Sequence, residues 1–231
     1  MQPLDPLQNT YAATLAAKSF RIAMAMAARE DLEIRQFDVV NAFLNAKLEG
    51  EPVYCELPEG FKEPGSCLEL KSAVYGMRDA PLLYKEFTST LRKLALKPST
   101  EEDCLFQNEQ KTVTVVFYVD DYLVLYHHKN KSEARKTIDG LCVRYEIKEQ
   151  KNSEWYLGVR IVRNRAARRL CLVHDIYIEK IAKRFNLTEG TAPSTPLPSI
   201  PLRKFQGNAT KSEIKDFQER VGSILYTAIM I

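Results

Sequence analysis

The pattern of apolar and polar positions is clearest over residues 112–126, where two apolar runs enclose two adjacent aspartates. The runs are rich in β-branched and aromatic side chains without glycine or proline, and Asp120 and Asp121 lie between them. This pattern predicts two buried strands, here called the acidic hairpin, with the acidic pair at the bend. A solvated Asp-Asp turn is the simplest interpretation. The apolar flanks argue against it, because buried like charges are costly unless a positive group such as a divalent cation compensates for them.

Elsewhere the spacing of apolar residues predicts helices and short strands. Strands are expected over residues 32–39, 53–57, 68–70 and 104–107, and in a second hairpin over 155–162 and 169–174. Helices are expected over about 10–29, 81–95, 132–142, 176–187 and 210–231. Ser132 and the Thr210–Glu213 pair are expected to cap their helices. These elements indicate an α+β fold in which an antiparallel sheet carries the acidic hairpin and packs against helices.

A third carboxylate is expected beside the acidic pair. Asp38 lies near the end of the predicted strand 32–39, and strand pairing could bring it beside Asp120 although 82 positions separate them. Three carboxylates on adjacent strands form an oxygen-rich site suited to Mg²⁺ or Mn²⁺. Two such ions about 3.5–4 Å apart would clamp an in-line phosphoryl transfer. Spacing alone leaves this metal site a hypothesis.

Composition narrows the class of protein. With 231 residues, of which 45% are hydrophobic and 27% charged, the chain is typical of a soluble globular protein with a full core. The net charge of +3 permits a nucleic-acid partner without requiring one. Five scattered cysteines without a Cys-x-x-Cys pair favour a reduced intracellular protein without structural zinc. No signal peptide is evident and no apolar run is long enough to cross a bilayer, so no membrane partner is expected.

The C-terminal part contains an arginine-rich turn, which allows two interpretations, and a proline-rich segment, which marks a boundary. The turn of the second hairpin carries Arg163, Arg165, Arg168 and Arg169, which could meet nucleic-acid phosphates or form a solvated tip. The proline-rich segment 191–201 predicts an extended connector between the main body and the last helix.

Six short segments occur in a fixed order along the chain: Gln36-Phe-Asp-Val-Val-Asn-Ala-Phe-Leu-Asn45, Pro58-Glu-Gly-Phe61, Ala73-Val-Tyr-Gly-Met-Arg-Asp-Ala-Pro81, Tyr118-Val-Asp-Asp121, Trp155-Tyr-Leu-Gly-Val-Arg-Ile161 and Val221-Gly-Ser-Ile-Leu-Tyr226. Through them the chain resembles the reverse transcriptase domain of copia-type LTR retrotransposons, most closely the fungal branch. Each segment alone is weakly specific, whereas six in the right order are strong. The resemblance extends from residue 10 to residue 226 and marks the chain as a fragment of a larger polyprotein.

The resemblance implies a catalytic role for the three aspartates. Asp38 would supply the carboxylate of the first polymerase motif, and Asp120 and Asp121 those of the tyrosine-x-Asp-Asp motif. All three would hold two Mg²⁺ or Mn²⁺ ions, with Asp38 and Asp120 as the principal ligands and Asp121 in support.

The resemblance also implies which residues bind substrate. Phe43 matches the steric gate that excludes a ribose 2′-hydroxyl and so selects deoxynucleotides. Core packing is the alternative for Phe43 and Tyr75, and a packed strand is the alternative for Trp155 and Tyr156. The full implied set is the backbone of Val39, Val40, Asn41 and Ala42 at the triphosphate, Tyr75 and Gly76 at the incoming nucleotide and template, and Trp155, Tyr156, Leu157 and Gly158 as the primer grip.

The implied architecture is that of a polymerase. Residues 1–163 would form a fingers remnant and the palm, and residues 164–231 a hairpin, a helix, the proline-rich connector and the start of a helical thumb or connection. The implied function is RNA-directed DNA polymerase, which transfers dNTPs to a primer on an RNA or DNA template. Protease, integrase and ribonuclease H parts of the polyprotein are expected partners, in a cytoplasmic virus-like particle or in the nucleus.

Three departures from the family pattern leave a second hypothesis open. The basic, glycine-containing segment that usually begins the domain and supplies cations to the triphosphate is not in the sequence. The segment Leu82-Leu-Tyr-Lys85 lacks a usual tryptophan, and Asn45-Ala46 replaces the commoner Asn-Gly or His-Gly. The alternative is a degenerate, catalytically inactive fragment that retains the fold and binds nucleic acid.

Overall fold

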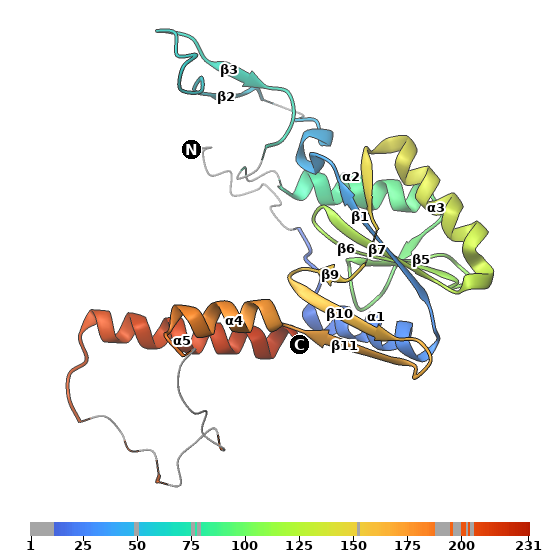
Figure 1. The fold of residues 1–231 in the computed structure, drawn as a ribbon. Helices are drawn as coiled ribbons and strands as arrows, with labels where there is room; N and C mark the ends of the chain where they lie inside the picture. The colour runs from blue at the N-terminus through green and yellow to red at the C-terminus, as the bar shows by residue number, and fades with distance from the viewer. Residues whose placement is uncertain are drawn as a thin grey trace. The chain divides into compact units, whose positions relative to one another are not determined.

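The structure is a computed structural model that describes residues 12–48, 51–74, 77, 80–151, 153–187, 195, 200–201, 203 and 206–231. The chain divides into two compact units (Figure 1). The first unit comprises residues 1–153 and 164–170, and the second comprises residues 154–163 and 171–231. The functional division predicted at residue 163 stays a prediction.

An antiparallel six-stranded sheet forms the centre of the first unit, as the apolar pattern predicts. Its strand order is β4-β5-β6-β7-β1-β8. The strands are β1 (Glu33–Val39), β4 (Lys97–Pro98), β5 (Leu105–Gln107), β6 (Val113–Tyr118), β7 (Asp121–Tyr126) and β8 (Ile147–Gln150). The acidic hairpin is confirmed as β6 and β7, which are buried along almost their whole length.

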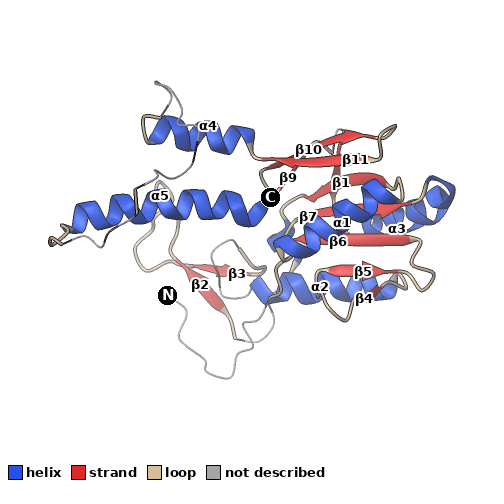
Figure 2. Cartoon of the chain, turned by 90° about the horizontal axis from the view of Figure 1, so that it is seen from below, coloured by secondary structure: helices blue, strands red, loops and turns tan. Residues whose placement is uncertain are grey.

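Helices cover both faces of this sheet, which explains why its two central strands, β6 and β7, carry apolar residues at almost every position, with Thr114 and Asp121 as the exceptions. Helix α1 (Ala17–Arg29) covers one face, and α2 (Ala80–Lys93) and α3 (Lys131–Arg144) cover the other (Figures 1 and 2). The short element η1 (Ala42–Asn45) follows β1, and η2 (His128–Asn130) precedes α3. The strands β2 (Val53–Cys55) and β3 (Leu68–Leu70) pair with each other.

Aromatic rings form the core between the sheet and α2. Phe37 and Tyr122, which face each other across β1 and β7, stack with ring centroids 5.1 Å apart. Phe87 on α2 lies 4.9 Å from Phe117 and 5.8 Å from Tyr122, between centroids. Each ring contributes both apolar area and specific ring contacts.

Two predictions for the first unit are wrong in detail, and one strand was not predicted. The first helix begins at Ala17 and not near residue 10, because Ala13 and Ala16 make backbone contacts with Cys104 and Glu102 that hold the preceding segment extended. Ser132 does not cap α3, since η2 runs directly into a helix that begins at Lys131. Strand β8 was not predicted, because its polar sequence has no apolar pattern. It is an edge strand, which forms through its pairing with β1.

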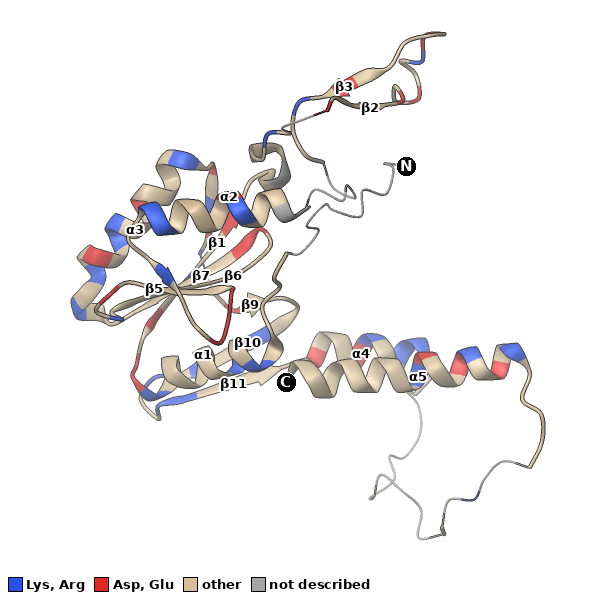
Figure 3. Ribbon diagram, turned by 180° about the vertical axis from the view of Figure 1, so that it is seen from behind, with Lys and Arg blue, Asp and Glu red and all other residues tan. Residues whose placement is uncertain are grey.

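The second unit contains a three-stranded sheet and two helices. The strands β9 (Trp155–Tyr156), β10 (Val159–Asn164) and β11 (Arg169–Val173) are joined in the order β11-β10-β9. Basic and acidic side chains are interspersed along α4 (Asp175–Arg184) and α5 (Lys211–Met230) (Figure 3), and Arg184 pairs with Glu219 at 2.7 Å. Thr210 and Glu213 form the predicted capping box at the start of α5.

Within the described part of the chain, no helix combines the length and the apolar character that crossing a membrane requires.

Candidate active site

The pairing of β1 with β7 brings the three predicted aspartates together. Asp38 lies directly opposite Asp121 in the register of the two strands. Directly opposed residues point to the same face of a sheet, so both carboxylates lie on one face near the end of the acidic hairpin. Asp120 occupies the adjoining turn, where its carbonyl oxygen accepts a hydrogen bond of 3.0 Å from the Val39 amide. The predicted neighbour of Asp38 in the register was Asp120, and the structure pairs it with Asp121.

The charge state of Asp121 reflects this crowding. Its pKa is raised from 3.8 to about 6, first because the side chain is partly buried and then because Asp120 and Asp38 repel its negative form. A hydrogen bond from Gln36 acts in the opposite direction and lowers the pKa. Gln36 lies two residues before Asp38 on the same face of β1, and its side chain is buried. Sequence reasoning missed Gln36, although its spacing from Asp38 was a usable signal.

This pKa shift predicts how the stability of the metal-free protein depends on pH. A carboxyl whose pKa is higher in the folded chain binds its proton more tightly when folded, so stability falls as the pH rises from about 4 to 6. Asp121→Asn removes this cost and should raise the free energy of unfolding at pH 7 by about 1–2 kcal/mol, and by little at pH 4. Urea unfolding at both pH values measures the effect, with the exposed Asp139→Asn as control. A pH-independent difference would contradict the cause assigned here.

The turn of the acidic hairpin is strained at Val119. Tyr118 pairs with Asp121, so Val119 and Asp120 form a two-residue loop, and Val119 has a φ of 57°. A positive φ at the first loop position matches a type II′ turn, which favours glycine there, and a β-branched residue adopts this conformation at a cost. Strain of this kind is often located at functional sites.

The strain at Val119 predicts an unusual response to glycine. Val119→Gly should raise the free energy of unfolding by about 0.5–1 kcal/mol, because glycine adopts a positive φ without a steric cost. Val143→Gly, at an exposed helical position, should instead lower it by roughly 0.5–1 kcal/mol. Chemical denaturation of both variants tests the prediction, and a loss of stability in Val119→Gly would show that the turn carries no strain.

The segment after Asp38 folds into a tight turn. Asn41 has a φ of 50°, and the Asn45 side chain donates to the carbonyl oxygens of Val40 and Asn41 at 3.4 and 3.3 Å. The amides of Val39 and Val40 donate to the carbonyls of Asp120 and Glu146 at 3.0 and 2.9 Å. These two amides are therefore engaged within the protein and do not face a ligand. The side chain of Phe43 and the residues Tyr75 and Gly76 lie outside the described part of the chain.

A protein-family model described as reverse transcriptase (RNA-dependent DNA polymerase) matches residues 4–199. The chain belongs to this reverse transcriptase family. The match covers five of the six segments on which the sequence-based resemblance rests, and the sixth, residues 221–226, lies beyond it.

Relatives of the chain are retrotransposon proteins from plants and yeast. The Retrovirus-related Pol polyprotein from transposon TNT 1-94 of Nicotiana tabacum is 31% identical over 91% of this chain and 17% of that protein. The corresponding polyprotein from transposon RE2 of Arabidopsis thaliana is 28% identical over 95% of this chain and 15% of that protein. The Putative transposon Ty5-1 protein of Saccharomyces cerevisiae is 29% identical over 83% of this chain and 63% of that protein. The copia-type resemblance is confirmed, and the chain spans less than a fifth of the plant polyproteins.

Reverse transcriptases are expected to hold divalent cations, and the donor chemistry of this site fits them. The three aspartates offer hard oxygen ligands, and the repulsion that raises the Asp121 pKa is of the kind that a cation relieves. Among the described residues, however, no three acidic, histidine or cysteine side chains are arranged so that they could hold a metal ion. The carboxylates are thus neighbours whose side chains would have to reorient to chelate a cation.

The predicted primer-grip residues of this reverse transcriptase domain lie in the second unit. Trp155 and Tyr156 form β9, and Leu157 and Gly158 form the turn to β10 with φ values of 52° and 78°. Tyr156 is buried, which agrees with the packed-strand alternative for this residue. The contact of this turn with a primer stays a prediction.

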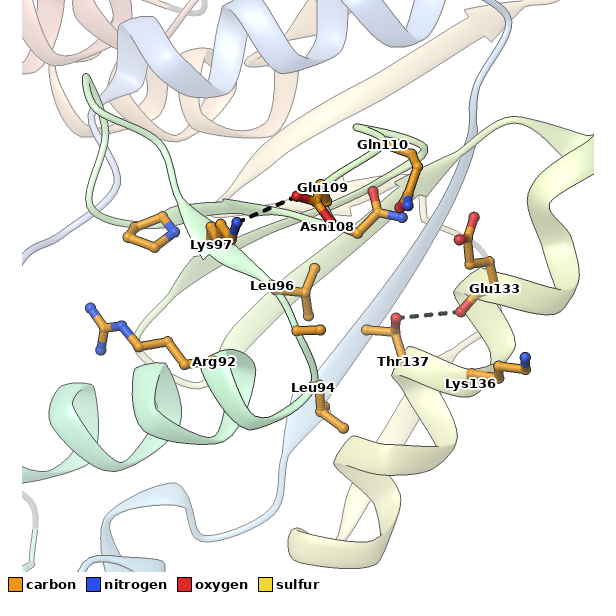
Figure 4. Close-up of a pocket in the computed structure, with 12 residues that line it drawn as sticks. Arg92, Leu94, Leu96, Lys97, Asn108, Glu109, Gln110, Glu133, Lys136 and Thr137 are labelled. Atoms are coloured by element: carbon orange, nitrogen blue, oxygen red, sulfur yellow. Dashed lines mark hydrogen bonds and ion pairs between the residues drawn. The ribbon is translucent and has the colours of Figure 1, made fainter.

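A cavity of about 530 Å³ lies at the opposite end of the main sheet from the aspartates (Figure 4). Its lining includes the end of α2, β4, the turn between β5 and β6, and the start of α3. Charges of both signs face each other there: Lys97 pairs with Glu109 at 3.8 Å, and Glu133 accepts a hydrogen bond of 2.6 Å from Thr112. Because side chains of both charge signs line the cavity, its described lining does not converge on one kind of ligand.

Proposed function

We propose that this chain is an RNA-directed DNA polymerase domain that extends a primer with dNTPs on an RNA or DNA template. The observation that carries the proposal is the pairing of Asp38 with Asp121 beside Asp120, within a chain of the reverse transcriptase family. Aspartates close together at the end of a buried hairpin suit the transfer of a nucleotide, in which negative charge builds up on phosphate oxygens.

Each part of the site would have a separate task. Asp38 and Asp120 would be the principal ligands of two Mg²⁺ or Mn²⁺ ions, which when bound neutralise the developing charge and orient the reacting oxygens. Asp121, held by Gln36, would support them. Because the Val39 and Val40 amides are engaged, Asn41 and Ala42 are the backbone positions proposed to contact the triphosphate. Phe43, Tyr75 and Gly76 would line the nucleotide, and Trp155–Gly158 would hold the primer end.

The proposal extends to the rest of the retrotransposon. The relatives are Pol polyproteins of which this chain matches a small part. We therefore propose protease, integrase and ribonuclease H segments as its partners, and the palm, fingers and thumb as its polymerase subdomains.

A second candidate is a nucleic-acid-binding domain without turnover. It is favoured by the arrangement of the described carboxylates, which is not suited to chelation as it stands. This candidate would bind a primer–template in a salt-sensitive way without requiring a nucleotide.

Primer extension separates the two candidates. The chain would be incubated with poly(A), an oligo(dT) primer and dTTP, with Mg²⁺ or Mn²⁺ and then with excess chelator. Extension that the chelator abolishes is expected for the polymerase. Binding of the primer–template, measured by fluorescence anisotropy, without any extension in either metal would instead support the second candidate.

A further inference from the structure

The segment that contains β9 and β10 is attached at both ends to the strand that carries Asp38. Immediately before β9, the Ser153 hydroxyl donates to the Ile34 carbonyl oxygen at 3.3 Å. Immediately after β10, the turn 164–168, here called the arginine tip, belongs to the same compact unit as β1. The intervening residues 154–163 include the proposed primer-grip turn and belong to the second unit.

Arg165 makes the main attachment of the arginine tip. Its Nη1 lies 3.1 Å from Asp31 Oδ1 and its Nη2 lies 2.5 Å from Glu33 Oε2, so one guanidinium joins two carboxylates at the start of β1. Arg168 adds a bond of 3.2 Å from its Nη1 to the carbonyl oxygen of Arg29 at the end of α1. Figure 3 shows the basic tip beside the acidic segment between α1 and β1.

The backbone of the arginine tip is folded so that both side chains face these partners. The Arg168 amide donates to the Arg165 carbonyl at 3.1 Å, the Ala167 amide donates to Asn164 Oδ1 at 3.0 Å, and Arg168 has a φ of 51°. Arg165 and Arg168 are therefore used within the protein. Residues 164–169 are nevertheless exposed, which agrees with the solvated tip, and contact of this turn with nucleic-acid phosphates stays a prediction.

We propose that Arg165 is a positioning residue: by fixing the arginine tip to β1, it constrains the backbone between Ser153 and the tip, which includes Trp155–Gly158. The expected effect on primer binding rests on the proposed polymerase function, whereas the attachment of the arginine tip does not. Glu33 lies on β1, five residues before Asp38, and Ile34 on the same strand accepts the bond from Ser153, so both ends of this backbone segment are attached to β1. A guanidinium fork suits this task, because it fixes direction as well as distance.

If Arg165 only stabilised the fold, its removal would mainly lower the global stability of the chain. The side chains of Arg165, Asp31 and Glu33 are 43%, 35% and 30% exposed, and ion pairs this open contribute little to global stability. Removal of Arg165 should therefore change the unfolding midpoint slightly while it changes the local environment of the hairpin clearly.

Trp155 allows a direct test, because it is the single tryptophan of the chain and lies in β9. Its emission spectrum and its quenching by acrylamide would be compared in the wild-type chain, Arg165→Ala, Arg165→Lys and the matched control Arg169→Ala, whose side chain is exposed on the same hairpin. A fifth protein, Asp31→Asn with Glu33→Gln, removes both acceptors, and asparagine tolerates the positive φ at position 31. All spectra are taken at one pH, because His128 also faces Glu33.

Arg165→Ala is expected to increase Trp155 quenching at least twofold, whereas Arg169→Ala leaves it unchanged. Arg165→Lys should give an intermediate value, since an ammonium cannot join both carboxylates in the same geometry. In the Asp31→Asn, Glu33→Gln background, Arg165→Ala should have no further effect. Equal quenching in the Arg165→Ala and Arg169→Ala variants, or additive effects in the double background, would overturn the proposal. If Arg165→Ala unfolds the chain, Trp155 quenching in Arg165→Lys and in the Asp31→Asn, Glu33→Gln variant is compared with that in Arg169→Ala instead. Increased quenching in both supports the proposal, and quenching equal to the control overturns it.

Primer–template binding links the result to function and keeps the two proposals apart. The dissociation constant is expected to rise about 3- to 10-fold in Arg165→Ala and less than twofold in Arg169→Ala, with kcat at saturating primer–template almost unchanged. Equal weakening by both variants would identify a general loss of positive charge and overturn the positioning role. A wild-type chain without polymerase activity would refute the proposed function, but Trp155 quenching would still report on the Arg165 attachment.

Discussion

Asp38→Asn and Asp120→Asn are each expected to lower the rate of nucleotide incorporation by about a thousandfold or more, which corresponds to roughly 4 kcal/mol of transition-state stabilisation. Asparagine retains the size of the side chain and removes the negative charge that a divalent cation requires. Asp38 and Asp120 are placed for this role by different means, the first by the register of β1 and the second by the turn that follows β6. Substitution of either residue should therefore leave the sheet intact.

Asp121→Asn should have a smaller effect, about 10- to 100-fold, because we propose only a supporting role for this carboxylate. Single-turnover primer extension at saturating dTTP measures all three variants, and circular dichroism checks that each one folds. The control is Asp139→Asn, an exposed aspartate on α3 that pairs with Arg135. Wild-type rates in Asp120→Asn would show that the assigned carboxylates do not act in catalysis, whatever the family of the chain.

The acidic hairpin and Asp38 could be predicted because burial leaves a strong mark on sequence. Residues 113–118 and 122–126 are almost continuously apolar since helices cover both faces of the sheet, and Asp38 lies between the buried residues Phe37 and Val39 at the end of β1. The order of the six family segments then joined these elements into one site. The exact partner of Asp38 could not be predicted, because a shift of one position in strand register leaves each strand's own sequence unchanged.

Other features depend on contacts between distant residues and leave no local signal. The polar strand β8 exists because it pairs with β1, and the extended segment 12–16 is held by contacts with residues 102–104. Arg165 was read as a phosphate ligand or a solvated side chain because its acidic partners lie more than 130 positions earlier. The positive φ of Val119 could not be predicted either, since valine is a typical strand residue.

Phe87→Ala is expected to lower the free energy of unfolding of the first unit by about 3–5 kcal/mol, the usual cost of removing a buried aromatic ring. Phe87 is buried, and its ring contacts Phe117, Tyr122 and Tyr145 with centroid distances of 4.9, 5.8 and 5.8 Å. Alanine would leave a cavity among rings from β6, β7 and the segment that follows α3. Urea unfolding measures the change, and Phe61→Ala, at a loop position where the ring is 73% exposed, should change stability by less than about 0.5 kcal/mol.

The same substitution should also disturb the active site before the chain unfolds. Phe37 and Tyr122 are the sequence neighbours of Asp38 and Asp121, and they stack on the face of the sheet that Phe87 covers. Because side chains alternate in strands, each carboxylate lies on one face of the sheet and its neighbouring ring on the other. The stacked rings therefore hold the backbone that carries the two aspartates. Phe87→Leu, which fills part of the cavity, should keep the chain folded at 20 °C and still slow incorporation several-fold. Full activity in a folded Phe87→Leu variant would show that the position of the carboxylates is fixed by the strand register alone.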